Sequence, residues 1–167
     1  MTALVFILSM DIQDEETILW QSSRKLNWTD FKGVPENNRA AAITASGLTY
    51  QFSTTKKNGE VVAIDYEVSS YFYPDKSWYR PEVCDTIILS HEQLHFDITE
   101  LYAREFRRRL KVQKFTSNVK NEVKAIYREI NIELNKYQDQ YDTETNFSRN
   151  REQQLFWNKT IAEALIQ

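Results

Sequence analysis

Residues 90–97 read Ser-His-Glu-Gln-Leu-His-Phe-Asp, and this stretch holds the only two histidines of the chain. His91 and His95 stand four positions apart, with Glu92 directly after the first, in the pattern H-E-x-x-H. On an α-helix such positions share one face, so both imidazoles can reach one metal ion. Glu92 would then lie beside a metal-bound water and take its proton. The stretch therefore predicts a zinc-peptidase helix, and a pair of helix-surface histidines without metal is the alternative.

Composition indicates a globular chain with one domain. The chain has 167 residues, of which 41% are hydrophobic and 13% aromatic, enough for a hydrophobic core. Its net charge of -3 gives no electrostatic basis for binding nucleic acid, which favours basic surfaces. The one cysteine, Cys84, permits neither an intrachain disulfide nor a cysteine-rich zinc site. We expect Cys84 to be a buried apolar side chain, with metal ligation as the alternative.

The N-terminal residues 3–10 form an apolar run that is followed by acidic residues. The run is too short to span a bilayer, so we expect no stable membrane span. It resembles the hydrophobic core of a secretory signal peptide, although the basic residues that precede such a core are missing. We interpret residues 1–16 as a truncated signal segment, ahead of a single domain at 17–167, and expect an exported protein, periplasmic or extracellular. The alternative is that the segment is a first strand.

Residues 17–80 have the composition of strands and turns. They contain all three glycines and two of the three prolines. Residues 43–52 and 61–73 are rich in β-branched and aromatic side chains, and the Lys-Lys-Asn-Gly sequence at 56–59 predicts a hairpin turn between them. Upstream, residues 26–31 predict a short helix or turn.

Beyond Pro81 the chain contains neither glycine nor proline, and its hydrophobic residues recur at helical spacing. Three helices are predicted: from Pro81 or Glu82 to 111, from 117 to 141, and from 150 to 165. Both histidines fall on the inward stripe of the first helix, where water can be excluded. The sequence therefore predicts an α+β fold, in which an N-terminal antiparallel sheet is followed by an active-site helix and two further helices.

A catalytic zinc ion needs three protein ligands and an open position for water. No third histidine exists, so the third ligand should be a carboxylate, or less readily Cys84 or a tyrosine. Asp97 and Glu100 project toward the far side of the motif helix, and we expect them to cap, pair with arginines or support neighbouring elements. The remaining carboxylate candidates lie on the second predicted helix or in the loop after it: Glu122, Glu129, Glu133, Asp139, Asp142 and Glu144.

Asp142 is the preferred third ligand. It follows Tyr141 at the predicted junction of helix and loop, where a side chain is free to turn inward. Tyr141 would then be close enough to donate a hydrogen bond to a developing oxyanion, a role that needs a preplaced donor. The alternatives are that Asp142 caps the turn and that Tyr141 is an ordinary core residue.

Three short segments of the sequence, read in order along the chain, carry recognisable patterns. Residues 24–33 read R-x-L-x-W-x-D-F-x-G, residues 91–98 read H-E-Q-x-H-F-D-I, and residues 141–145 read Y-D-x-x-T. From about residue 20 to residue 157, the chain resembles a bacterial family of domains of unknown function (number 922), whose members are predicted secreted zinc-dependent proteases. The resemblance implies a Zn²⁺ cofactor, export, and a peptide or protein as the substrate.

One position departs from the pattern of that family, whose third segment commonly reads Y-D-x-x-T-x-H-G. Here Phe147 stands at the histidine position and Ser148 at the glycine position. If the family's histidine were the third ligand, this chain would lack it. If Asp142 is the ligand, the change is peripheral.

The leading hypothesis is a zincin-like α+β metallopeptidase. In it His91, His95 and Asp142 bind Zn²⁺, and Glu92 serves as general base and then as proton donor to the leaving amine. By analogy with zincins, the substrate would lie along an edge strand in the 61–73 region.

The competing hypothesis is a non-catalytic exported binding or structural domain that keeps the fold, with or without a metal. Phe147 favours this hypothesis. Glu92 opposes it, because a purely structural metal site would not require a carboxylate at that position.

Overall fold

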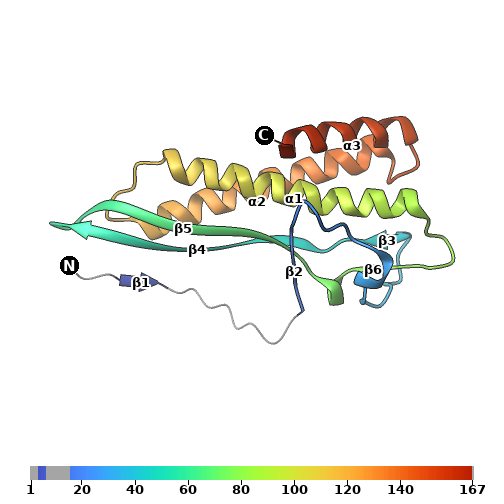
Figure 1. Cartoon of the computed structure of the whole chain (residues 1–167), viewed down its shortest axis with the longest axis horizontal. Coiled ribbons are helices and arrows are strands. Elements are labelled where there is room, and N and C mark those ends of the chain that lie inside the picture. Colours follow the sequence, from blue (N-terminus) through green and yellow to red (C-terminus); the bar gives the residue numbers. More distant parts are fainter. Residues whose placement is uncertain (1–3, 7–15, 167) are drawn as a thin grey trace.

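The computed structural model describes residues 4–6 and 16–166 as an antiparallel sheet followed by three helices (Figure 1), which confirms the predicted α+β class and element order. One sheet has the strand order β1-β4-β5-β2, and a second pairs β3 with β6. The strands are β1 (Leu4–Phe6), β2 (Ile18–Leu19), β3 (Ala42–Ile43), β4 (Ser46–Lys57), β5 (Glu60–Phe72) and β6 (Trp78–Tyr79). The helices are η1 (Trp28–Asp30), η2 (Pro74–Lys76), α1 (Thr86–Val112), α2 (Val119–Thr145) and α3 (Arg151–Ile166).

The long hairpin of β4 and β5 forms the floor on which α1 and α2 lie (Figure 1). Asn58 and Gly59 at its tip have φ values of 54° and 84°, the left-handed backbone that a two-residue hairpin turn requires. The predicted hairpin is therefore confirmed, with strands that run up to the turn on both sides. A register shift between Thr55 and Lys56 interrupts the otherwise regular pairing.

One hydrophobic core lies between the hairpin and the three helices. Inward side chains alternate along β4 and β5 and recur at helical spacing along α1, α2 and α3, as period-two and 3.6-residue patterns require. Burial of each large apolar side chain contributes roughly 1.5–3 kcal/mol. The core includes Leu48, Phe52, Val68, Ile98, Phe106, Leu110, Val123, Ile130, Leu134 and Ile161.

The first helix begins later than its composition predicts. The expected start at residue 81 or 82 is wrong, because the chain turns there and Asp85 caps the helix by accepting hydrogen bonds from the backbone N–H groups of Ile87 and Ile88, both at 2.9 Å.

The second helix ends later than predicted. It continues past residue 141 to Thr145 and stops where Asn146 takes a left-handed backbone with φ 47°. Asp142 therefore lies in the last helical turn instead of at a junction with a loop. The prediction for α3 holds, and the side chain of Asn150 caps it by accepting from Gln153 N at 3.2 Å.

The back of the motif helix α1 holds the segment before β3. Gln93 Oε1 accepts from the backbone N–H of Leu26 at 2.6 Å, and Asp97 accepts from the indole of Trp20 at 2.7 Å. Phe96 packs with Phe72 in a second small core. The predicted supporting role of Asp97 is confirmed.

Glu100 has the same supporting role one turn further along α1. Its carboxylate accepts from the Ser70 hydroxyl at 2.6 Å and pairs with Arg107 at 3.0 Å. The guanidinium of Arg107 also donates to Val68 O at 2.6 Å, which ties α1 to β5. The prediction that Glu100 pairs with arginines is confirmed.

Only part of the N-terminal segment lies within the described residues. Residues 4–6 form β1, which pairs antiparallel with β4, whereas residues 1–3 and 7–15 lie outside the description. The signal-segment interpretation of residues 1–16 therefore stays a prediction. In the described ranges, no helix is long and apolar enough to cross a membrane.

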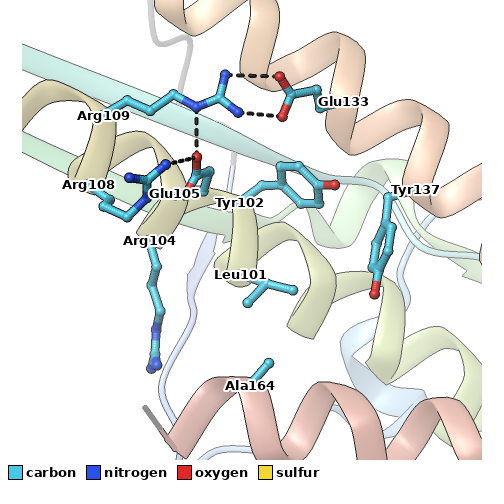
Figure 2. Close-up of a pocket in the computed structure, with 9 residues that line it drawn as sticks. All are labelled: Leu101, Tyr102, Arg104, Glu105, Arg108, Arg109, Glu133, Tyr137 and Ala164. Carbon is cyan, nitrogen blue, oxygen red and sulfur yellow. Dashed lines mark hydrogen bonds and ion pairs between the residues drawn. The ribbon is translucent and has the colours of Figure 1, made fainter. Parts of the chain in front are cut away.

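A groove with charged side chains lies between the three helices (Figure 2), and neither histidine lines it. Arg109 makes two bonds to Glu133, at 2.9 and 2.6 Å, and a third to Glu105 at 2.7 Å. Arg108 also binds Glu105, and this hydrogen bond together with that of Arg109 lowers the pKa of Glu105 from 4.5 to about 2. The charges of the groove thus satisfy one another and clamp α1 to α2.

This network predicts a pH-dependent contribution to stability. Folding lowers the pKa of Glu105, so its carboxylate adds to the free energy of unfolding. This contribution is fully present above pH 4.5 and is lost as the pH falls toward about 2. We expect Glu105→Gln to lower the free energy of unfolding by about 0.5 kcal/mol at neutral pH, with the difference closing in that acid range. Urea unfolding at a series of pH values measures it. Glu163→Gln, whose ion pair with Lys159 spans 3.8 Å, is the control and should change stability less. A difference that does not vary with pH would contradict the prediction.

Candidate metal site

Three side chains from two helices meet between α1 and α2. The Nε2 atoms of His91 and His95 each lie 3.0 Å from Oδ1 of Asp142, and 3.3 Å from each other. Both histidines are buried, with exposed fractions of 4% and 9%. The structure therefore brings together the three residues that the sequence nominates as ligands.

The donor set fits a zinc ion. Zinc in proteins binds imidazole nitrogen and carboxylate oxygen at about 2.0–2.2 Å in a tetrahedron, which puts neighbouring ligand atoms about 3.3–3.6 Å apart. The separation of the two Nε2 atoms, 3.3 Å, matches that edge, and the two separations from Asp142, both 3.0 Å, are slightly shorter. The pKa values agree with an ionised carboxylate. Although burial acts to raise the pKa of Asp142, the hydrogen bonds with His91 and His95 hold it well below its usual range.

Two acidic side chains, Asp142 and Glu92, influence the imidazole of His95. Burial alone would lower the pKa of His95, but its hydrogen bond to Asp142 and the charge of Glu92 raise it on balance. A negative environment of this kind also attracts a cation to the nitrogen atoms that face Asp142.

Besides the cluster of His91, His95 and Asp142, the side chain of Glu92 also indicates a binding site. Its side chain is buried, with an exposed fraction of 5%, and Oε2 has no hydrogen-bond partner within the described part of the chain. A buried carboxylate oxygen without a partner is costly, and such atoms cluster where a ligand or water binds. Its charge is near enough to raise the pKa of His95.

Each imidazole is held at its other nitrogen by a glutamine. Nδ1 of His91 lies 2.9 Å from Oε1 of Gln154 on α3, and Nδ1 of His95 lies 2.7 Å from Oε1 of Gln138 on α2. The Nε2 atoms are thereby left for Asp142. Sequence reasoning gave neither glutamine a role, although Gln138 stands one helical turn before Asp142, a spacing that puts both on one face.

Tyr141 is fully buried beside the site. Its ring stacks on that of His91 with a centroid separation of 4.6 Å, and its hydroxyl donates to the backbone carbonyl of His91 at 3.2 Å. The same hydroxyl accepts from Gln154 Nε2 at 2.7 Å, and burial raises the pKa of the phenol. These contacts favour a positioning role for Tyr141, and its role as an oxyanion donor stays a prediction.

The other carboxylate candidates do not join the histidines. Glu133 is bound to Arg109 at 2.6 Å, and Glu144 accepts from the indole of Trp157 at 2.8 Å. Among the described residues, the one group of histidine, cysteine and acidic side chains able to share an ion contains Asp142 as its only carboxylate. The thiol of Cys84 is outside this group and donates to a backbone carbonyl.

A model of the family described as bacterial protein of unknown function (DUF922) matches residues 19–149. The chain belongs to this family. The match confirms the predicted resemblance and includes both histidines, Glu92 and Asp142, whereas Gln154 lies beyond its end. No curated protein and no solved structure matches the chain.

The α2–α3 loop contains Phe147 and Ser148, the two positions at which the sequence departs from the expected pattern. Asn146, Phe147 and Ser148 all have left-handed backbones, with φ values of 47°, 52° and 72°. The side chain of Phe147 is 59% exposed, so it does not take the place of a buried ligand. Ser148 adopts a backbone conformation that glycine favours.

Replacement of Ser148 by glycine should therefore stabilise the protein. Glycine relieves the steric cost of the left-handed backbone, which outweighs its greater freedom in the unfolded chain, and we expect a gain of about 1 kcal/mol. Thermal or urea unfolding measures the gain. Ser117→Gly, at an exposed turn whose φ is not positive, is the matched control and should give none. Equal effects at the two serines would rule out backbone strain at Ser148.

Proposed function

We propose that this DUF922 protein is a zinc-dependent metallopeptidase with a zincin-like active site, acting on a peptide or protein substrate. The observation that supports it most is the convergence of His91, His95 and Asp142, whose three facing atoms lie within 3.3 Å of one another. The unpartnered oxygen of Glu92 adds the base that hydrolysis needs. Export is part of the same proposal and rests on the apolar run at residues 3–10.

In this proposal each residue has a distinct role. His91, His95 and Asp142 would hold Zn²⁺, which when bound supplies Lewis-acid polarisation of a carbonyl and lowers the pKa of a water. Glu92 Oε2 takes the proton of the attacking water and then returns it to the leaving amine. The surrounding burial excludes bulk water and strengthens the electrostatic interactions within the site.

The structure counts against the 61–73 region as the substrate strand. That region meets α1 at Glu100 and Arg107 through Ser70 and Val68, and its Phe72 reaches Phe96 only on the face of α1 opposite the histidines. Glu100 stands two turns beyond Glu92, about 12 Å along the helix. The residue after β3 is closer, because the hydroxyl of Thr44 donates to the Glu92 carbonyl at 3.1 Å. We therefore propose that the peptide lies beside β3.

Metal binding is the first test of this function. Purified protein dialysed against zinc should carry about one zinc ion per chain by mass spectrometry of its metal content. His91→Ala and Asp142→Asn should each lose most of it, because each removes one of three ligands. Glu129→Gln, an exposed carboxylate on α2, is the control and should keep it. Unchanged zinc content in the Asp142→Asn protein would show that Asp142 is not a zinc ligand.

Catalysis is tested separately with Glu92→Gln. This variant keeps the shape of the side chain but not its basicity, so it should bind zinc normally and hydrolyse peptides about 10²–10⁴-fold more slowly. A broad peptide library read by mass spectrometry measures the rates. If zinc-loaded wild-type protein cleaves nothing that Glu92→Gln leaves intact, the non-catalytic binding domain is the better description.

A further inference from the structure

The amide groups of Gln138 and Gln154 are held in one orientation by their own donors. Nε2 of Gln154 donates to the Tyr141 hydroxyl at 2.7 Å and to Asn158 Oδ1 at 2.9 Å, which uses both of its hydrogens. Asn158 is itself fixed, since its amide donates to the Ser90 hydroxyl at 3.1 Å. Gln154 therefore presents only its oxygen to the imidazole of His91.

Gln138 is oriented in the same sense by a second set of contacts. Its Nε2 donates to the hydroxyl oxygen of Thr99 at 3.3 Å, and Thr99 donates to the backbone carbonyl of His95 at 3.0 Å. Because the hydroxyl hydrogen of Thr99 is used, its oxygen is left to accept. Gln138 Oε1 consequently faces Nδ1 of His95 as an acceptor.

An amide oxygen that faces Nδ1 requires a hydrogen on that nitrogen. In a neutral imidazole with Nδ1–H, the Nε2 atom carries a lone pair. When both rings are neutral in this way, the two Nε2 atoms and the ionised Asp142 oxygen are all acceptors at 3.0–3.3 Å, and a cation between them satisfies all three. A ring that gains a second proton instead donates its Nε2–H to Asp142. Free histidine in water favours the opposite tautomer, with the hydrogen on Nε2.

We propose that Gln138 and Gln154 are positioning residues that set both histidines in the Nδ1–H tautomer before any metal binds, so that the site is prepared for a divalent cation. The inference rests on the proposed zinc function and extends it to the shell behind the ligands. Outer partners of this kind tune metal affinity, and their loss typically costs 10- to 100-fold. Neutral amides have a further consequence. They add no negative charge, so a bound dication faces only the single charge of Asp142 among its ligands.

The direct test is the tautomeric state of the two histidines in metal-free protein, read from long-range ¹⁵N–¹H NMR correlations above the pH at which the imidazoles titrate. Both histidines should carry their hydrogen on Nδ1. Gln138→Leu should move His95, and Gln154→Leu should move His91, toward the Nε2–H form. Each leucine variant should also bind zinc 10- to 100-fold more weakly in a chelator competition.

Two further variants separate positioning from a general structural effect. Gln138→Glu restores an acceptor and should return His95 to the Nδ1–H form. Gln140→Leu, on the same helix but exposed, should change neither the tautomers nor zinc affinity. Nε2–H histidines in the metal-free wild-type protein overturn the inference, even if zinc binds. The predicted tautomers without zinc binding would instead overturn the metal function and leave the positioning roles standing.

Discussion

The central constraint is that two imidazole nitrogens and one carboxylate oxygen share a small buried space between α1 and α2. These atoms lie 3.0–3.3 Å apart, and when both rings are neutral with Nδ1–H facing an amide oxygen, all three act as acceptors. Acceptors at such distances repel, so the arrangement needs a cation or additional protons to be stable. The rest of the fold serves to hold this arrangement in place, since the hairpin supports α1 while α2 and α3 bring the groups that complete it.

Two opposite faces of the motif helix α1 make essential contacts. This explains why residues other than the two histidines and the glutamate belong to its sequence pattern. One face presents His91 and His95 to α2. The opposite face uses Gln93, Phe96 and Asp97 to hold the chain segment before β3. A change on the rear face would therefore reach the site by shifting α1, although it touches no ligand.

Most features that depend on a short stretch of sequence were predicted correctly. The hairpin follows from Asn58 and Gly59, which accept a left-handed backbone, and the facing histidines follow from helical spacing. The preference for Asp142 among six carboxylates rested on an expected junction of helix and loop, whereas the residue lies in the last turn of α2. The sequence of either helix alone does not specify how α1 and α2 cross. For the same reason the roles of Gln138 and Gln154 were out of reach, as each depends on a partner 43 or 63 positions away.

X-ray absorption spectroscopy of the zinc-loaded protein tests the central claim most directly. Ligation by two histidines and Asp142 predicts nitrogen and oxygen neighbours at about 2.0–2.1 Å, with the outer scattering of two imidazoles and no sulfur. A sulfur neighbour at about 2.3 Å would place Cys84 in the site, and fewer than two imidazoles would remove a histidine from it. Either result would contradict the proposed metal centre.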